Sequence, residues 1–390
     1  MDARWRKPQA SAVRLSCLVR SAFVDFILRC SILEEEEPTR ASREPFALFH
    51  PDVTVGLVVE VGGARQKLSF SLHGARTLSK RLLSILALSL ALITSCEPPR
   101  ESSLRTEQQP LLEQGDSAQE FQTSLERGLV AWRSRDSREK VEEAIAHFED
   151  ATRCSPAEKE PGAKARVMVD TLLKLSEAHY YIGHTHMEFD GRKESNRKDL
   201  RDRFEKGLTA AERALVLIDK DTAALLSGDE KEMRRGLTQI PDDAIPALYW
   251  YAVNLGEWSR HAGPRHMMRY RERVKLAVEV VQRRMPNHDH AGADRFLGIY
   301  HSRFPASGGD PRRSEAAFKE SLELSPNYFD TRFRYALHYA VLVQERELFE
   351  RQLRRILETP ASVVPELEPE NKLAQDHARD LLTKADQLFF

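Results

Sequence analysis

The residues with the clearest chemical potential lie in one aromatic stretch, residues 247–258, which holds two of the four tryptophans of the chain. Trp250, Asn254 and Trp258 are spaced four apart, so on a helix they project along one face, with Tyr251 on the adjoining stripe. Aromatic rings beside one amide, which both donates and accepts hydrogen bonds, are typical of the wall of a ligand cleft. The same face would equally serve as the packed core between two helices. Both interpretations remain open at this level.

Other arrangements that could carry catalysis or hold a metal are incomplete. His184 with His186, and likewise His288 with His290, supply two nitrogen ligands each, but neither pair has a third ligand at helical spacing. No nucleophile is placed beside a base, and no phosphate loop or dinucleotide fingerprint occurs. We therefore expect no catalytic residue, no metal and no cofactor. A helical hydrolase or lyase with a dispersed site is the enzymatic alternative.

The overall charge argues against nucleic acid as a partner. The 59 Lys and Arg residues nearly cancel the 60 Asp and Glu residues, so the chain has no overall charge that favours nucleic acid. One basic run is more typical of a solvated or anion-facing surface than of a nucleic-acid groove, and it comprises Arg265, Arg269, Arg271 and Arg273.

Asp310 before Pro311 predicts a helix N-cap and first helical residue, rather than a phosphate-binding turn.

A cysteine follows an apolar run in the first quarter of the chain. Lys80 and Arg81 precede the uncharged residues 82–93, and small residues then lead to Cys96. The three parts match a secretory signal, and the apolar run is too short to span a bilayer. The ending resembles the bacterial lipobox, in which the cysteine receives a diacylglyceryl group and becomes the new N-terminus. We expect residues 77–95 to be a lipoprotein signal peptide and Cys96 to anchor a periplasmic protein to the cell envelope membrane.

A signal peptide in this position leaves residues 1–76 unexplained. No methionine lies between Met1 and Met168, so we expect translation to start at a non-AUG codon near Leu78 and residues 1–76 to be a mis-assigned or disordered extension. One alternating stretch within them, Val53–Val61, has the pattern of a strand. Residues 96–115 have the polar composition of a tether between lipid and domain.

Residues 116–390 show nearly continuous helical periodicity. The spacing A-x3-F-x2-A-x4-P is typical of the second helix of a tetratricopeptide repeat, and it occurs at Ala144, Phe148, Ala151 and Pro156 and returns in part at Phe318, Ser321 and Pro326. Glycines in the first helices, Gly183, Gly256 and Gly298, would let paired helices approach closely. We predict an all-α fold, a diverged tetratricopeptide-like array of four or five helical pairs, with residues 371–388 as a capping helix.

Several segments together resemble the TatT family, the tetratricopeptide-containing lipoproteins associated with tripartite ATP-independent periplasmic (TRAP) transporters. The resemblance covers roughly residues 80–390. It rests first on the aromatic stretch, residues 247–258, and then on residues 293–300, 305–310, 314–326 and 371–382. It implies a non-enzymatic periplasmic component that forms a homo-oligomer and binds the substrate-binding protein of a TRAP transporter. A generic scaffold lipoprotein for envelope protein assembly is the alternative.

The resemblance also bears on the aromatic face, because TRAP systems mostly carry organic acids. We expect Trp250, Tyr251, Asn254 and Trp258 to line or support a cleft for a small acidic solute with an apolar body. Arg295 would balance the carboxylate of that solute.

Overall fold

The computed structural model describes residues 53–61, 64–72, 100–105, 117–157, 162–189, 196–303 and 309–389. The chain divides into two compact units, Met1–Arg100 and Glu101–Phe390, which are described separately.

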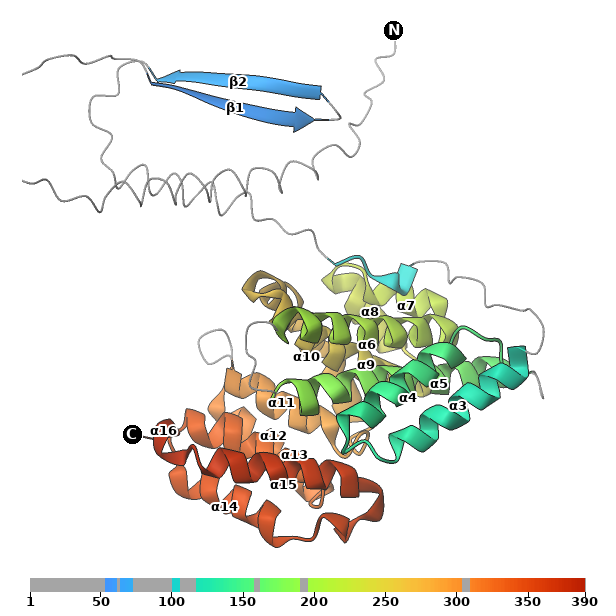
Figure 1. Cartoon of the computed structure of the whole chain (residues 1–390), viewed down its shortest axis with the longest axis vertical. Coiled ribbons are helices and arrows are strands. Elements are labelled where there is room, and N and C mark those ends of the chain that lie inside the picture. Colours follow the sequence, from blue (N-terminus) through green and yellow to red (C-terminus); the bar gives the residue numbers. More distant parts are fainter. Residues whose placement is uncertain are drawn as a thin grey trace, which may run out of the picture. The chain divides into compact units, whose positions relative to one another are not determined.

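The described part of the first unit is a β-hairpin. Strand β1 (Val53–Val61) pairs antiparallel with β2 (Ala64–Leu72), in a register that sets Val53 opposite Leu72 and Val61 opposite Ala64. The strand expected over Val53–Val61 is therefore confirmed, and Figure 1 shows the two arrows side by side. The predicted signal peptide and Cys96 lie outside the described residues, so the signal, the lipid anchor and the translation start stay predictions.

The second unit is all-α in its described residues, as predicted. The α-helices are α3 (Ser117–Trp132), α4 (Arg138–Ala151), α5 (Ala163–Tyr181), α6 (Asn196–Ile218), α7 (Lys220–Leu226), α8 (Glu230–Gln239), α9 (Ile245–Ala262), α10 (Pro264–Arg284), α11 (Gly292–Arg303), α12 (Pro311–Leu324), α13 (Phe329–Arg334), α14 (Arg346–Glu358), α15 (Glu368–Leu382) and α16 (Ala385–Leu388). Two π-helices, η2 (Ile182–Met187) and η5 (Tyr335–Ala340), extend α5 and α13, and short 3-10 turns are η1 (Ser103–Arg105), η3 (Asp242–Ala244), η6 (Ala361–Val363) and η7 (Pro365–Leu367). The capping segment is thus two helices, α15 and α16, rather than one.

Local sequence explains where several of these helices begin. The Asp310 side chain accepts a hydrogen bond from the backbone N–H of Arg312, and Pro311 occupies the first turn of α12, as the sequence predicts. Asp229 and Glu232 form a reciprocal capping box at the start of α8. Such caps satisfy backbone donors that a helix leaves unpaired at its N-terminus.

Helices adjacent in the sequence pack in pairs, α3 with α4, α5 with α6, α9 with α10, and α11 with α12. A glycine in one helix faces a phenylalanine in the other at three of these pairs. A Cβ added to Gly128, Gly183 or Gly298 would approach the rings of Phe148, Phe204 and Phe318 within 2.5, 2.7 and 2.8 Å, respectively. The glycines therefore make room for rings that hold each pair together, as the sequence predicts for Gly183 and Gly298.

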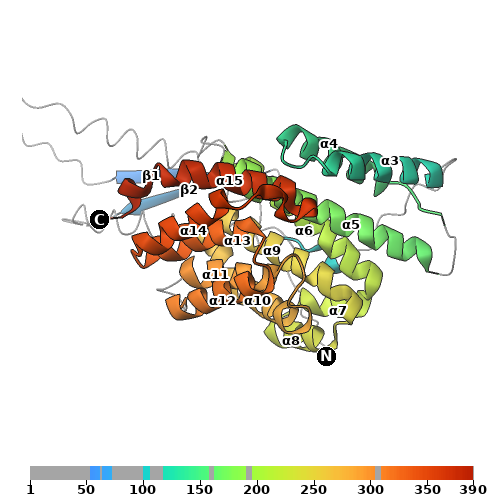
Figure 2. The ribbon, with the colours of Figure 1, turned by 90° about the horizontal axis from the view of Figure 1, so that it is seen from below.

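Consecutive pairs contact one another, α4 with α5, α6 with α9, and α10 with α11. Figure 1 shows the green helices α3 and α4 at one side of the second unit and the orange and red helices α14 and α15 at its lower edge. Seen from below in Figure 2, α15 crosses back toward the first helices. Arg135, in the turn between α3 and α4, places Nε 2.5 Å from Oε1 of Glu370 on α15. A salt bridge between residues 235 apart thus joins the beginning of the array to its end.

The segment before α3 is also fixed to the domain. The buried Glu212 of α6 accepts hydrogen bonds from the hydroxyls of Ser102 and Ser103, at 2.7 and 2.6 Å, and from the backbone N–H of Ser103. Leu104 is buried as well. Part of the tether expected over residues 96–115 is therefore packed on α6.

Candidate functional site

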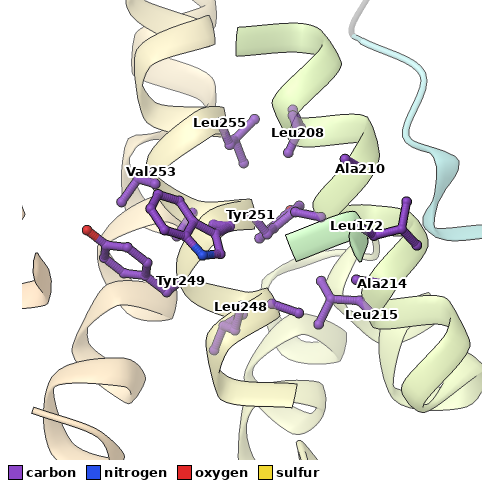
Figure 3. Close-up of a cluster of buried hydrophobic side chains, with 14 of the residues drawn as sticks. Leu172, Leu208, Ala210, Ala214, Leu215, Leu248, Tyr249, Tyr251, Val253 and Leu255 are labelled. Atoms are coloured by element: carbon purple, nitrogen blue, oxygen red, sulfur yellow. The ribbon is translucent and has the colours of Figure 1, made fainter. Parts of the chain in front are cut away.

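The aromatic helix predicted from the sequence is α9, and its signature side chains are buried. Trp250, Tyr251 and Trp258 are at most 7% exposed. Figure 3 shows Tyr251 between α9 and α6, with Leu255 facing Leu208, while Tyr249 points to the other side of α9. The apolar residues of this helix thus pack on both neighbouring sides.

Asn254 joins three helices through its side-chain amide. Its Nδ2 donates to the hydroxyl of Ser176 on α5 at 3.1 Å and to the carbonyl of Trp250 at 2.9 Å. The same serine donates to the backbone carbonyl of Gly207 on α6 at 2.7 Å. A Cβ on Gly207 would lie 2.4 Å from Oδ1 of Asn254, so only glycine leaves room for the amide there. Asn254 is completely buried, and these contacts favour a packing role.

The tryptophans make aromatic contacts rather than lining an open wall. The ring of Trp250 lies 4.9 Å from that of Tyr249 and 5.8 Å from that of Tyr180 on α5. The ring of Trp258 packs edge-on against His266 at 5.2 Å and Tyr270 at 5.7 Å, both on α10. The geometry favours the core interpretation of this face. A direct contact of these rings or of Asn254 with a solute stays a prediction.

Arg295 of α11 already has carboxylate partners within the chain. Its Nη2 lies 2.7 Å from Oδ2 of Asp289, its Nε lies 3.7 Å from Oδ2 of Asp330, and its guanidinium stacks 4.5 Å from the Tyr328 ring centre. Burial opposes its charge, but Tyr328 and the two aspartates outweigh burial and raise the pKa of Arg295. The arginine is therefore a permanent buried cation, balanced by neighbouring carboxylates.

Arg295 also holds an unusual loop. Three successive non-glycine residues, Asp289, His290 and Ala291, have φ angles of 48°, 54° and 58°. Residues that carry a side chain rarely adopt this left-handed backbone conformation, so the run stores strain that its surroundings must offset. Arg295 donates to the carbonyls of Asp289 and His290, and the hydroxyl of Tyr249 donates to the Asp289 carboxylate at 2.6 Å. These bonds tie the strained loop to α9 and α11.

A buried ionic network, which the sequence analysis did not identify, lies among α5, α9, α11, α13 and the two π-helices. Its centre is Arg334, which is fully buried. Arg334 donates from Nη1 to Glu188 at 3.1 Å, from Nε to Asp330 at 3.0 Å, and from Nη2 to the carbonyl of His184 at 2.9 Å. All three donating nitrogens of the guanidinium are thus used, as burial of such a charge requires.

The network continues to Glu257, which neighbours Trp258 in the aromatic helix. Its two carboxylate oxygens accept from Nε of Arg260 at 2.6 Å and from Nη1 of Arg303 at 3.2 Å. Arg260 also donates to Glu188 at 3.0 Å, which links this half to Arg334. Burial opposes ionisation of Glu188, but Arg334 and Arg260 lower its pKa to about 2. The pKa of Glu257 is likewise held well below its usual range by Arg260 and Arg303.

The two π-helices carry histidines into this network. Burial, with Arg334 next in importance, lowers the pKa of His184 to about 4. Burial and Arg303 hold the pKa of His338 well below its ordinary value. Both imidazoles are therefore neutral at pH 7. A π-helix within an α-helix is frequently found at functional sites.

A pocket of about 110 Å³ opens beside the network between α9, α10 and α11. One wall is apolar and consists chiefly of Met267, Val274, Phe296, Ile299 and Tyr300. The polar wall consists of Glu257, Arg260, Arg271 and Arg303. The pocket therefore combines an apolar lining with three arginines and one glutamate, and two of these arginines, Arg260 and Arg303, pair with Glu257. It shares the aromatic helix with the predicted cleft, but its walls are formed by other residues.

The histidine pairs have other surroundings. His184 stacks on Tyr180, and Nε2 of His186 lies 3.0 Å from the carbonyl oxygen of Arg135. His288 packs edge-on against Tyr249. Within the described residues, no group of three or more His, Cys, Asp or Glu side chains could hold a metal ion. No helix in this part of the chain combines the length and the apolar character needed to span a membrane.

Paired helices around a buried ionic network, with a small mixed pocket at its edge, place the second unit among the all-α proteins in its described residues. The chain belongs to the TAtT family, the TRAP transporter T-component, whose family model matches residues 173–389, more than half of its length. The resemblance inferred from the sequence is thereby confirmed. The family is a periplasmic-side accessory of TRAP transport and is not known as enzymatic. No curated protein matches the chain.

Proposed function

We propose that this protein is a lipid-anchored periplasmic accessory of a TRAP transporter that binds the substrate-binding protein and holds a small organic acid in the pocket between α9, α10 and α11. Family membership supports the transport role. In this proposal Cys96 carries the lipid, the helical pairs are tetratricopeptide-like, and the protein forms a homo-oligomer. Trp250, Tyr251, Asn254 and Trp258 of the predicted set belong to α9, which supplies Gly256, Glu257 and Ser259 to the pocket, and Arg295 belongs to α11, which supplies Phe296.

The observation that carries the solute proposal is the composition of the pocket. Arg260 and Arg303 both pair with Glu257, and Glu188, which does not line the pocket, lies on their other side. Arg271 lines the pocket as a further guanidinium. A carboxylate entering the pocket would find hydrogen-bond donors of opposite charge. The apolar wall, which includes Phe296 and Ile299, would bury the rest of the solute.

Calorimetric titration with hexanoate, and with hexanol as the uncharged analogue, tests this proposal. Arg271→Gln removes one positive charge from the pocket and leaves the Glu257 pairs in place. We expect hexanoate affinity to fall about tenfold, the equivalent of about 1.4 kcal/mol. Arg269→Gln is the matched control, because Arg269 is an exposed arginine of the same helix that does not line the pocket. Equal affinity for hexanoate and hexanol, or equal losses in the two variants, would contradict the solute proposal.

Partner binding needs a separate experiment. The lipidated protein, isolated from its native membrane with reversible crosslinking, should bring down a TRAP-type substrate-binding protein identified by mass spectrometry. Recovery of outer-membrane assembly factors instead would favour the alternative, a generic scaffold lipoprotein.

A further inference from the structure

Gly256 of α9 departs from the contact between glycine and phenylalanine that holds three other helical pairs together. In those pairs the ring comes from the partner helix. At Gly256 the partner helix α10 contributes Val274, 3.4 Å from the position of an added Cβ, and the ring is that of Phe296 on α11, at 3.0 Å. All three residues line the pocket between α9, α10 and α11. Gly256 therefore borders the proposed solute site.

Glycine is a poor helix former, so its place inside α9 needs a compensating role. At Gly298 that role is close packing, because an added Cβ would lie 2.8 Å from the fully buried ring of Phe318. At Gly256 the nearest ring atom is farther away and belongs to the half-buried Phe296. Packing explains this glycine less well, and the space that it leaves in the pocket supplies a second reason.

Along α9 and α11 the pocket lining changes from apolar to basic in the same direction. Arg260 follows Gly256 by four residues on α9, and Arg303 follows Phe296 by seven on α11, so each pair shares a helix face. Both arginines pair with Glu257, whose carboxylate therefore belongs to the charged end. At a rise of 1.5 Å per residue, the two ends are separated by about 6 Å along α9 and about 10 Å along α11.

Helix α10 gives the pocket the same polarity, although it runs in the opposite direction. Trp258 of α9 packs against Tyr270, and Gly256, two residues earlier on α9, lies beside Val274, four residues later on α10. Arg271 precedes Val274 by three residues, so it lies toward the charged end. All three helices therefore agree on the direction in which the lining changes.

We propose that Gly256, with Phe296 opposite it, forms the apolar end of this pocket and sets the length of the solute that the pocket accepts. The inference rests on the proposed solute function and makes it more specific. The carboxylate of the solute lies among Arg260, Arg271 and Arg303, and its chain extends toward Gly256. The separation of about 6–10 Å between the ends suits a monocarboxylic acid with a chain about as long as that of hexanoate. A side chain at position 256 would occupy the space in which that chain ends.

Titration calorimetry of the intact protein with butanoate, hexanoate and octanoate measures the length preference. Gly256→Ala shortens the pocket and should lower the affinity for hexanoate about fourfold relative to butanoate, which is the effect of leaving one methylene group unburied. Phe296→Leu removes part of the opposite wall and should raise the affinity for octanoate relative to hexanoate by a similar factor. The two variants thus shift the preference in opposite directions.

Phe148→Leu is the matched control, because it makes the same change at the contact between α3 and α4, outside the pocket, and should leave the length preference unaltered. If Gly256→Ala fails to fold, the shift in Phe296→Leu decides. An unchanged preference in the pocket variants, with hexanoate still bound, would overturn the role of Gly256 and leave the proposed solute function intact. The same shift in Phe148→Leu would also overturn it. A failure of the unaltered protein to bind any of the three acids would overturn both proposals.

Discussion

Arg334 and Glu188, 146 residues apart in the chain, meet inside the helical array with Nη1 of the arginine 3.1 Å from Oε2 of the glutamate. The contact joins the π-helical end of α5 to α13, and Asp330 satisfies the arginine from the other side. Charges buried this deeply are tolerated only when each has its partner, so the network should act as one unit.

The first prediction follows from this pair. Arg334→Met removes the buried cation that both Glu188 and Asp330 bind, so we expect the free energy of unfolding to fall by about 3–5 kcal/mol. Urea denaturation measures the loss. Arg346→Met is the control, because Arg346 is more exposed and its pairs with Glu350 and Asp386 should contribute under about 1 kcal/mol. Similar losses in the two variants would contradict a special role for the buried pair.

The second prediction concerns the aromatic helix. Asn254→Ala combined with Trp250→Phe removes the amide that joins α5 and α9 and part of a buried ring, so we expect a loss of about 3 kcal/mol. Asn287→Ala, at an exposed position, is the control. Thermal melting and hexanoate titration are measured on the same samples. A double variant that melts like the unaltered protein yet loses solute binding would establish the cleft interpretation instead.

The third prediction compares two helix glycines. Inside a helix, alanine stabilises the fold by about 1 kcal/mol relative to glycine. The contacts of the new Cβ therefore decide whether a Gly→Ala variant gains or loses stability. At Gly298 the new Cβ would lie 2.8 Å from three atoms of the fully buried Phe318, and we expect a net loss of about 1–3 kcal/mol. At Gly256 the nearest atom belongs to the half-buried Phe296 at 3.0 Å, so this variant should be close to neutral. Restoration of stability by Phe318→Leu in the Gly298→Ala background would confirm the steric cause, and equal stability of both glycine variants would argue against it.

The fourth prediction is a loss of stability in mild acid. Burial lowers the pKa of His184, His261 and His377 to about 4 from an ordinary value near 6.5, so the unfolded chain takes up protons before the folded one. Stability should therefore be constant above about pH 6.5 and fall as the pH drops toward 4. Glu188, with a pKa of about 2, extends the loss from about pH 4.5 downward.

Urea midpoints at pH 7.5, 5.5 and 4.5 measure this dependence. His184→Gln should reduce the dependence of the free energy of unfolding on pH between pH 6.5 and 4. One such histidine can contribute at most roughly 3 kcal/mol to this loss of stability. His147→Gln, at a half-buried position on α4, is the control. An unaltered slope in His184→Gln would show that this histidine does not contribute.

The fifth prediction concerns the anchor. Mass spectrometry of the native protein should find an acylated peptide that begins at Cys96, and Cys96→Ser should release the protein from the membrane fraction. Peptides from residues 1–76 on the mature protein would contradict both the signal peptide and the proposed translation start.

Several features of this protein are local, and the sequence alone was enough to predict them. Periodic apolar residues predict the helices, alternation predicts the strand Val53–Val61, and Asp310 with Pro311 predicts the start of α12, because each pattern acts on neighbouring turns or residues. Gly298 likewise indicated a close helix contact. The family resemblance rests on such local segments in a shared order.

The tertiary structure alone decided what the aromatic helix faces. Trp250 and Asn254 share one face whether that face is a cleft or a core, and the position of α5 and α6 against it makes it a packed surface. Similarly, Glu188, Glu257 and Arg334 look like ordinary solvated charges in the sequence. Their partners come from helices distant in the chain, and only the stacking of the array, closed by Arg135 and Glu370, removes those charges from water. Helical periodicity shows which residues share a face, but long-range packing determines which face is buried.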